Sequence, residues 1–124
     1  MRPPGVKQRL GRWGEEAAAQ YLAEKGYRLV EKNHRTPYGE IDLICEKNAT
    51  VVFVEVKTRS GIGFGQPEEA ITSTKRKHLL SAIAYYWQQI EQAEREWRVD
   101  VIAIQRRPGG KEIEVEHFEN AITD

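Results

Sequence analysis

Four charged residues stand inside two apolar runs of the stretch Gly39–Arg59, where a plain buried strand would have none. They are Glu40, Asp42, Glu55 and Lys57. Carboxylate oxygens are the ligands that Mg²⁺ and Mn²⁺ prefer. Such an ion can bind a phosphate oxygen and lower the pKa of a bound water. The types and spacing of these residues therefore predict a metal-dependent phosphodiesterase site.

The pairing of the two strands decides whether these side chains meet. A two-residue turn at 48–49 begins with an asparagine, which tolerates the positive φ that short hairpin turns need. Counting back from that turn places Asp42 opposite Glu55 and Glu40 opposite Lys57. Residues directly opposite in an antiparallel pair share a face, with Cβ atoms about 4.5–5.5 Å apart. We therefore expect all four side chains on one face of the hairpin.

Two facing carboxylates repel each other unless a cation lies between them. With Asp42 and Glu55 on the metal, Lys57 could orient the attacking water or stabilise charge developing on phosphorus. The alternative is an ion-pair ladder on a half-exposed sheet, which contributes little to stability. Against a ladder, Glu55 and Lys57 interrupt an apolar run, VVFVEVK, that is otherwise typical of a central strand.

The composition of the chain restricts its class. At 124 residues, 40% apolar and 31% charged, it predicts a single domain over 1–124, with 1–6 as a loose arm. Lys+Arg and Asp+Glu are 19 each, so any nucleic-acid binding must rest on local charge. We expect a cytoplasmic protein, because no apolar run approaches the ~20 residues of a membrane span and the N-terminus lacks a signal core. A single cysteine excludes an internal disulfide and a multi-cysteine zinc site.

The apolar pattern predicts the element order α-β-β-β-α-β-β. The expected helices cover 7–25 and about 73–95, and the expected strands cover 27–32, 40–46, 51–57, 97–105 and 112–118, with a turn region at 33–38. Short turns make the first three strands an antiparallel meander. The long helix then crosses over to place 97–105 parallel to 51–57. Between them we expect a loop at 60–67, favoured as an ordinary connection over a flap carrying Phe64, and a short helix at 67–71.

Several motifs resemble known families. Asp42, twelve residues, then Glu55-Val56-Lys57 is similar to the PD-(D/E)xK nuclease signature, although Ile41 stands where that motif has proline. More closely, the chain resembles the YraN-type bacterial proteins of unassigned function, through G-R-W-G-E-x-x-A at 11–18, G-E-I-D-L-I at 39–44, F-V-E-V-K-T-R at 53–59 and R-x-D-V at 98–101.

The resemblance implies a restriction-endonuclease-like αβββαβ core, with α/β mixed-sheet architecture, as in Holliday-junction resolvases. It also implies dependence on Mg²⁺ (or Mn²⁺) and a phosphodiester substrate. In that pattern Asp42 and Glu55 are metal ligands and Lys57 is the catalytic lysine. Related resolvases place a helical glutamate against the metal, so Glu15 is the candidate for an extra ligand; the alternative is a flanking surface carboxylate. Glu40 is a secondary candidate, with a plain ion pair to Lys57 as its alternative.

A basic group begins the long helix. Lys75, Arg76 and Lys77 oppose the helix dipole there, so local stability does not explain them. A helix N-terminus with added lysines suits a phosphate group. With Arg59, these residues form a predicted DNA-binding rim, to which Lys7, Arg9 and Arg12 could add. The alternative is a solvated charge run.

The remaining polar residues of the strands are expected to be structural or marginal. Asp100 interrupts an apolar strand and needs a partner such as Arg98. Cys45 is expected to share a face with Ile41 and Leu43 as a small core residue. Among the histidines, His34 is the one expected near the site.

Two functions compete at this stage. The first is a Mg²⁺/Mn²⁺-dependent nuclease on DNA, including branched or damaged DNA, for which a homodimer would allow both strands of a duplex to be cut. The second is a non-catalytic module that retains the nuclease fold and binds nucleic acid or a protein partner. The intact Asp/Glu/Lys set favours the nuclease.

Overall fold

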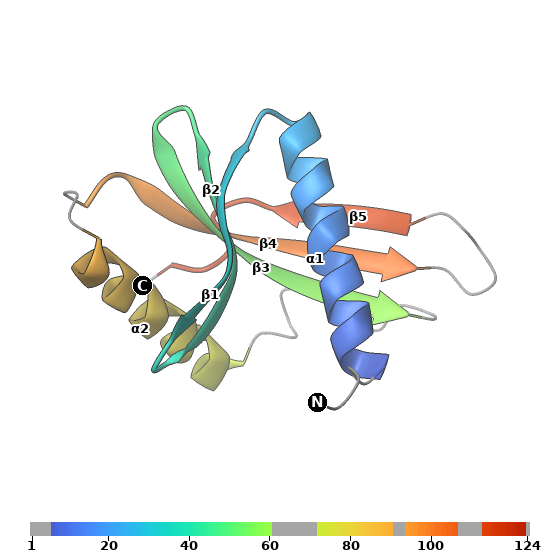
Figure 1. Ribbon diagram of the computed structural model, residues 1–124, viewed down its shortest axis with the longest axis horizontal. Helices are drawn as coiled ribbons and strands as arrows, with labels where there is room; N and C mark the ends of the chain where they lie inside the picture. The colour runs from blue at the N-terminus through green and yellow to red at the C-terminus, as the bar shows by residue number, and fades with distance from the viewer. Residues whose placement is uncertain (1–5, 61–71, 91–93, 107–112, 124) are drawn as a thin grey trace.

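The structure, a computed structural model, describes residues 6–60, 72–90, 94–106 and 113–123. Its elements are α1 (Val6–Glu24), β1 (Arg28–Thr36), β2 (Gly39–Lys47), β3 (Thr50–Ser60), α2 (Ser73–Gln89), β4 (Trp97–Arg106) and β5 (Ile113–Phe118) (Figure 1). This is the predicted order. Apart from Val6, the expected arm lies outside the described residues, as do Phe64 and the expected helix at 67–71.

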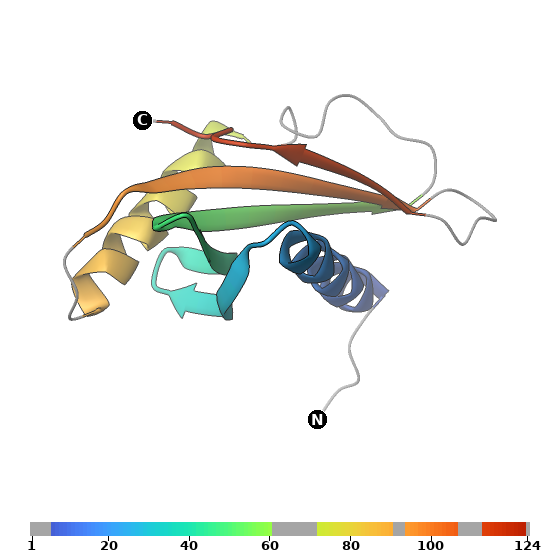
Figure 2. The same cartoon turned by 90° about the horizontal axis from the view of Figure 1, so that it is seen from above.

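The five strands form one mixed sheet in the order β1-β2-β3-β4-β5. β3 and β4 are parallel and the other neighbours are antiparallel, which confirms the predicted meander and crossover. In Figure 2 the β1–β2 hairpin curls away from the long strands β3 and β4. None of the helices within the described ranges is long and apolar enough to cross a membrane.

The core consists of two clusters, because β3 and β4 are apolar on both faces. Val52 and Val54 of β3 pack with Leu22 of α1, whereas Phe53 packs with Ile83 of α2. Successive residues of a strand point to opposite faces, so the two helices cover opposite sides of the sheet. The catalytic candidates on β3 follow directly after these buried residues.

The first strand and the second helix differ from the prediction. β1 continues through Thr36, so the expected turn region at 33–38 shrinks to Pro37 and Tyr38. β1 is a mostly exposed edge strand, and it therefore lacks the apolar alternation that marks a half-buried strand. The helix α2 ends at Gln89 and not near residue 95, because Ile90 adopts an extended conformation with ψ of 147°.

The strand β2 bends in its first half. Ile41 and Ile44 both belong to the α2-side cluster, whereas Leu43 and Cys45 belong to the α1-side cluster. The expectation that Cys45 shares a face with Ile41 is therefore wrong, although Cys45 is a buried core residue as predicted. This bend shapes the candidate site.

Candidate functional site

The β2–β3 hairpin opens into a fork. Its turn is as predicted, with Lys47 paired to Thr50 and with positive φ at residues 48 and 49. The ladder runs back to the pair Leu43–Val54 and ends there. Beyond that pair, the backbone N–H of Val56 donates to Oδ2 of Asp42 at 2.8 Å. A carboxylate thus occupies the place of the next ladder contact, and we call this point the fork.

The fork corrects two predicted pairs, because Asp42–Glu55 and Glu40–Lys57 are not ladder partners. Glu40 pairs instead with Arg35 of β1, whose Nε lies 3.8 Å from the Glu40 carboxylate. Nζ of Lys57 lies 3.4 Å from Oε1 of Glu55. The bend in β2 separates the four charges into two groups, so they do not share one face as expected.

The first group is a cluster of three carboxylates, the carboxylate cluster, formed by Glu15, Glu40 and Asp42. Their ligand oxygens all lie within 4.8 Å of one another. The side-chain amide of Asn33 donates to Glu15 at 2.9 Å and to Glu40 at 2.8 Å. One amide therefore holds a carboxylate from α1 beside one from β2. The structure brings the predicted extra ligand, Glu15, and the secondary candidate, Glu40, to Asp42.

A close helix–strand contact lets α1 reach the fork. Gly14 is buried, and a Cβ added there would lie 1.8 Å from Oγ1 of Thr58 on β3. No real Cβ tolerates such a distance, so a glycine is required for the helix to lie this near the strand. Glu15 is the next residue, and the contact holds its backbone beside the sheet. This is a physical reason for the G-E pair in the first motif.

The electrostatics of Asp42 are unusual for a carboxylate. Burial, followed by the nearby charge of Glu55, raises its pKa to about 8. That value includes smaller increases from Glu15 and Glu40 and the opposing effect of the hydrogen bond from Val56. The fork therefore concentrates negative charge where water can only partly solvate it. A cation bound there would remove the repulsion.

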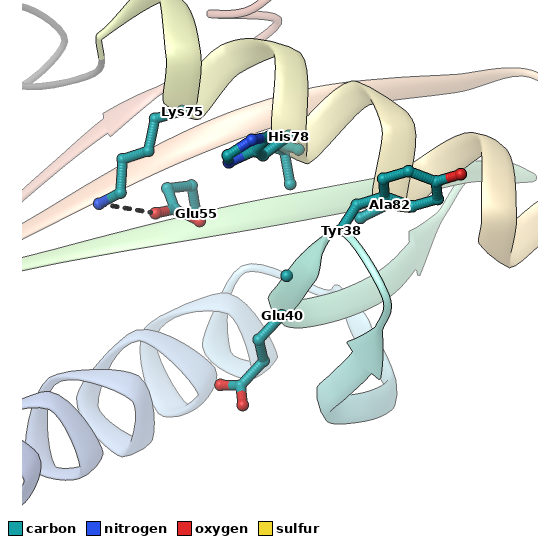
Figure 3. A pocket seen from close by; sticks show the side chains of 8 residues that line it. Tyr38, Glu40, Glu55, Lys75, His78 and Ala82 are labelled. Atoms are coloured by element: carbon teal, nitrogen blue, oxygen red, sulfur yellow. Dashed lines mark ion pairs between the residues drawn. The ribbon is translucent and has the colours of Figure 1, made fainter.

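The second group faces α2. Oε1 of Glu55 lies 3.4 Å from Nζ of Lys57. The same oxygen lies 3.7 Å from Nζ of Lys75 (Figure 3). Glu55 and Lys57 are largely buried, whereas the Lys75 side chain is about half exposed. Burial, followed by contact with Lys75, lowers the pKa of Lys57 against the opposing effect of Glu55. The predicted ligand Glu55 thus contacts two lysines in this structure, while its charge still acts on Asp42.

A cavity of about 190 Å³ lies between the β1–β2 turn and α2, beside both groups (Figure 3). It is lined by Tyr38, Gly39, Glu40, Glu55, Lys75, His78, Leu79 and Ala82. Of the predicted DNA-binding residues, Lys75 lies at this cavity, whereas Arg76 and Lys77 are exposed on α2. Arg59 is half-buried on β3 and has contacts of its own.

Comparison with known proteins places the chain in a family. The model of the uncharacterised protein family UPF0102 matches residues 14–104. The chain belongs to this family. A UPF0102 protein of Syntrophotalea carbinolica is 45% identical over 112 residues, covering 90% of this chain and 89% of the relative. One of Syntrophomonas wolfei is 46% identical over 116 residues, covering 94% and 99%.

Family membership confirms the YraN-type resemblance, and it names no reaction. The matched range contains every member of the carboxylate cluster together with Glu55, Lys57 and Lys75. The fork and the cavity are thus part of the UPF0102 domain itself. The fold, a five-stranded mixed sheet with two helices, is compatible with the α/β nuclease-like core that was expected.

Three residues of this UPF0102 site were missed from the sequence. Asn33 was assigned to a turn, and its polar neighbours gave no signal that its amide would bind two glutamates. Tyr38 and His78 line the cavity, and a tyrosine before a glycine at a turn was the one available cue. His34, expected near the site, instead packs its ring edge-on to Tyr86 and pairs with Glu31.

A fully buried aspartate of the UPF0102 chain lies far from the fork in sequence. Asp100 is fully buried and accepts hydrogen bonds from Arg98 at 2.9 Å and from the backbone N–H of Asn120 at 2.9 Å. Nε2 of His117 lies 2.7 Å from its other oxygen. The expected partner Arg98 is present, and the residue is structural as predicted.

Proposed function

We propose that this UPF0102 protein is a Mg²⁺- or Mn²⁺-dependent nuclease that hydrolyses phosphodiester bonds in DNA, with branched or damaged DNA as a candidate substrate. The observation that carries the proposal is the convergence of Glu15, Glu40 and Asp42 within 4.8 Å at a strand fork beside Glu55 and Lys57. The Asp42, Glu55 and Lys57 pattern also fits the PD-(D/E)xK signature.

The donor set at the fork suits a hard divalent cation. The candidate ligands of the carboxylate cluster are all carboxylate oxygens. Mg²⁺ and Mn²⁺ prefer such oxygen ligands, whereas Zn²⁺ and Cu²⁺ are more often bound by nitrogen or sulfur. Burial and then the charges of nearby glutamates raise the pKa of Asp42, which supports a cation as the missing partner at this point. Asp42, Glu15 and Glu40 would hold the ion, with Glu55 bordering it. When bound, it would polarise a phosphate oxygen and lower the pKa of a water molecule.

The side chains around the cluster suggest distinct roles. Lys57 is largely buried and has a lowered pKa, so its amine is placed to orient a water or to stabilise charge on the phosphate. Lys75 stands in the first turn of α2, where the helix dipole also favours a phosphate. Arg59, Arg76 and Lys77 would contact the DNA backbone. Their contribution should be independent of base sequence.

One observation favours a second candidate, a nucleic-acid- or protein-binding module that keeps the nuclease fold without turnover. The carboxylate of Glu55 already contacts two lysines, which reduces its need for a metal. The two functions differ in what Asp42 does. A nuclease needs its carboxylate for metal binding and cleavage, whereas a binding module would retain DNA without it.

The test measures cleavage of single-stranded, duplex and four-way-junction DNA with Mn²⁺. We expect Asp42→Asn and Lys57→Met each to lower the rate by about 100-fold or more. Titration calorimetry should show Mn²⁺ binding that Asp42→Asn abolishes. Glu15→Gln should weaken that binding, and its exposed neighbour provides the matched control, Glu16→Gln, which should not. Wild-type protein that cleaves none of the three substrates, or variants that cleave as fast as wild type, would contradict the proposal.

A further inference from the structure

The cavity beside the fork has a polar end and an apolar end. In Figure 3, Glu55 and Lys75 lie at one end, Tyr38 and Ala82 lie at the other, and His78 stands between them. Leu79 and Ala82 are buried residues of α2 and give the cavity an apolar wall. Glu40 also lines this cavity, but its carboxylate points away toward α1 and into the carboxylate cluster, so Glu40 stands between the cavity and the proposed metal site (Figure 3).

Tyr38 is held on the rim by a defined turn. Its backbone N–H donates to Oγ1 of Thr36 at 3.1 Å, and that hydroxyl donates to the carbonyl of Gly39 at 2.7 Å. Gly39 has a φ of +128°, a conformation that a residue with a Cβ adopts only under strain. Tyr38 itself is 50% exposed, although its ring meets the ring of Tyr85 edge-on at 6.4 Å. A large aromatic ring is therefore fixed beside the cavity with much of its surface uncovered.

These features fit one chemical class of ligand. The cavity, about 190 Å³, is smaller than the ~300–1,000 Å³ of typical drug-sized sites, so it suits one small planar group. A nucleobase has an apolar face that stacks on aromatic rings and a polar edge that Lys75 or His78 could bind. Its attached phosphate would then lie toward the fork, where the cleavage chemistry is proposed.

We infer that this cavity binds one unpaired base of a DNA strand, next to the phosphodiester bond at the fork, and that Tyr38 stacks on that base. The inference rests on the proposed function, because it identifies that function's substrate class as single-stranded or locally unpaired DNA. A paired base is stacked within its duplex, and bringing it into a pocket requires flipping it out at a cost of a few kcal/mol. Junctions, ends and damaged sites supply unpaired bases without that cost.

The test compares two single strands of equal length and equal phosphate count, one with normal bases and one made entirely of abasic units. Binding is measured by fluorescence anisotropy with Ca²⁺, another oxygen-preferring cation, and a gel checks that the strands stay intact. We expect wild-type protein to bind the normal strand about tenfold more tightly than the abasic strand, a typical effect of one stacked base. Tyr38→Ala should abolish this difference, and Tyr38→Phe should preserve it. Ile113→Ala, at an exposed apolar residue of β5, is the control and should also preserve it.

Equal affinity of wild-type protein for the two strands would overturn the inference, and so would the absence of binding to either. It would also be overturned if Tyr38→Ala weakened binding to both strands equally, since the ring would then not read the base. Cleavage with Mn²⁺ is scored separately. If the protein distinguishes the two strands but does not cleave DNA, base binding in the cavity is supported and the nuclease proposal is contradicted. If it cleaves DNA but binds both strands equally, the nuclease proposal is supported and base binding in the cavity is contradicted.

Discussion

Two aspartates of this chain, the half-buried Asp42 and the fully buried Asp100, have opposite surroundings. Asp100 is fully buried, yet Arg98, His117 and the N–H of Asn120 all contact its carboxylate. Burial alone would raise its pKa, but these three hydrogen bonds together lower it. Asp42 accepts one N–H, from Val56, and its other neighbours include three glutamates. Its pKa rises to about 8.

The difference shows that burial of a carboxylate does not by itself indicate its role. What matters is whether the protein supplies the compensating charge and donors. Around Asp100 the compensating charge and donors are all present, and the hydrogen bond from Asn120 connects β4 to the segment that follows β5. Around Asp42 they are lacking, and the deficit is one that a divalent cation could fill.

The largest expected effect is on stability. Asp100→Asn should lower the free energy of unfolding by about 3–5 kcal/mol, because Arg98 would be left without its buried counter-charge. Asp42→Asn should leave stability unchanged or raise it in the presence of a chelator, because it removes repulsion and keeps an oxygen to accept from Val56. Urea denaturation measures both. The contrast would fail if the two substitutions destabilised the protein equally.

A second prediction concerns the contact that carries Glu15 to the fork. Gly14→Ala should destabilise the protein by about 1–3 kcal/mol and weaken Mn²⁺ binding, because its Cβ would collide with Thr58. The matched control is Gly11→Ala on the same helix, where a Cβ meets nothing within 4 Å. That variant should be neutral or more stable by about 0.5–1 kcal/mol. If calorimetry showed that Gly14→Ala leaves the Mn²⁺ affinity unchanged, the position of α1 would not matter for metal binding, and the prediction would be contradicted.

The third prediction is a pair of opposite pH dependences, measured in a chelator. The pKa of Asp100 is below its ordinary value of 3.8 when folded. Its contribution is therefore present above pH 4 and lost as the pH falls through the folded pKa. Asp42, with a folded pKa of about 8, should instead favour the folded state at low pH and lose that contribution as the pH rises from about 4 to 8.

Subtracting the pH–stability curve of each asparagine variant from that of the wild type isolates each residue. The two difference curves should slope in opposite directions. Curves of the same slope would show that the fork lacks the excess negative charge on which the metal proposal depends.

Much of the fold follows from the sequence. The element order, the parallel pairing of β3 with β4 and the 48–49 turn were predicted correctly, because apolar periodicity and short turns restrict the topology strongly. The length of β1 was not predicted correctly, because an exposed edge strand has little apolar pattern. The end of α2 was missed because the residues after Gln89, IEQAER, continue a pattern that is compatible with a helix.

For the candidate site, the sequence identified most of the residues but not how they are arranged. Asp42, Glu55, Lys57 and Glu15 were all named, and the structure places them around one fork. Counting an ideal register put Glu40 opposite Lys57, but the bend in β2 turns Glu40 toward Glu15. A bend depends on how both faces of a strand pack, which residue spacing along one strand does not reveal. The same limit hid the role of Asn33.

The contact between Gly14 and Thr58 also determines when the site exists. The carboxylate cluster is divided between a helix and a strand, so its members converge only while α1 is docked on the sheet. A nascent or partly melted chain carries the same residues at scattered positions. The convergence of the three carboxylates is therefore a property of the folded domain, and a chain in which α1 has not docked lacks it.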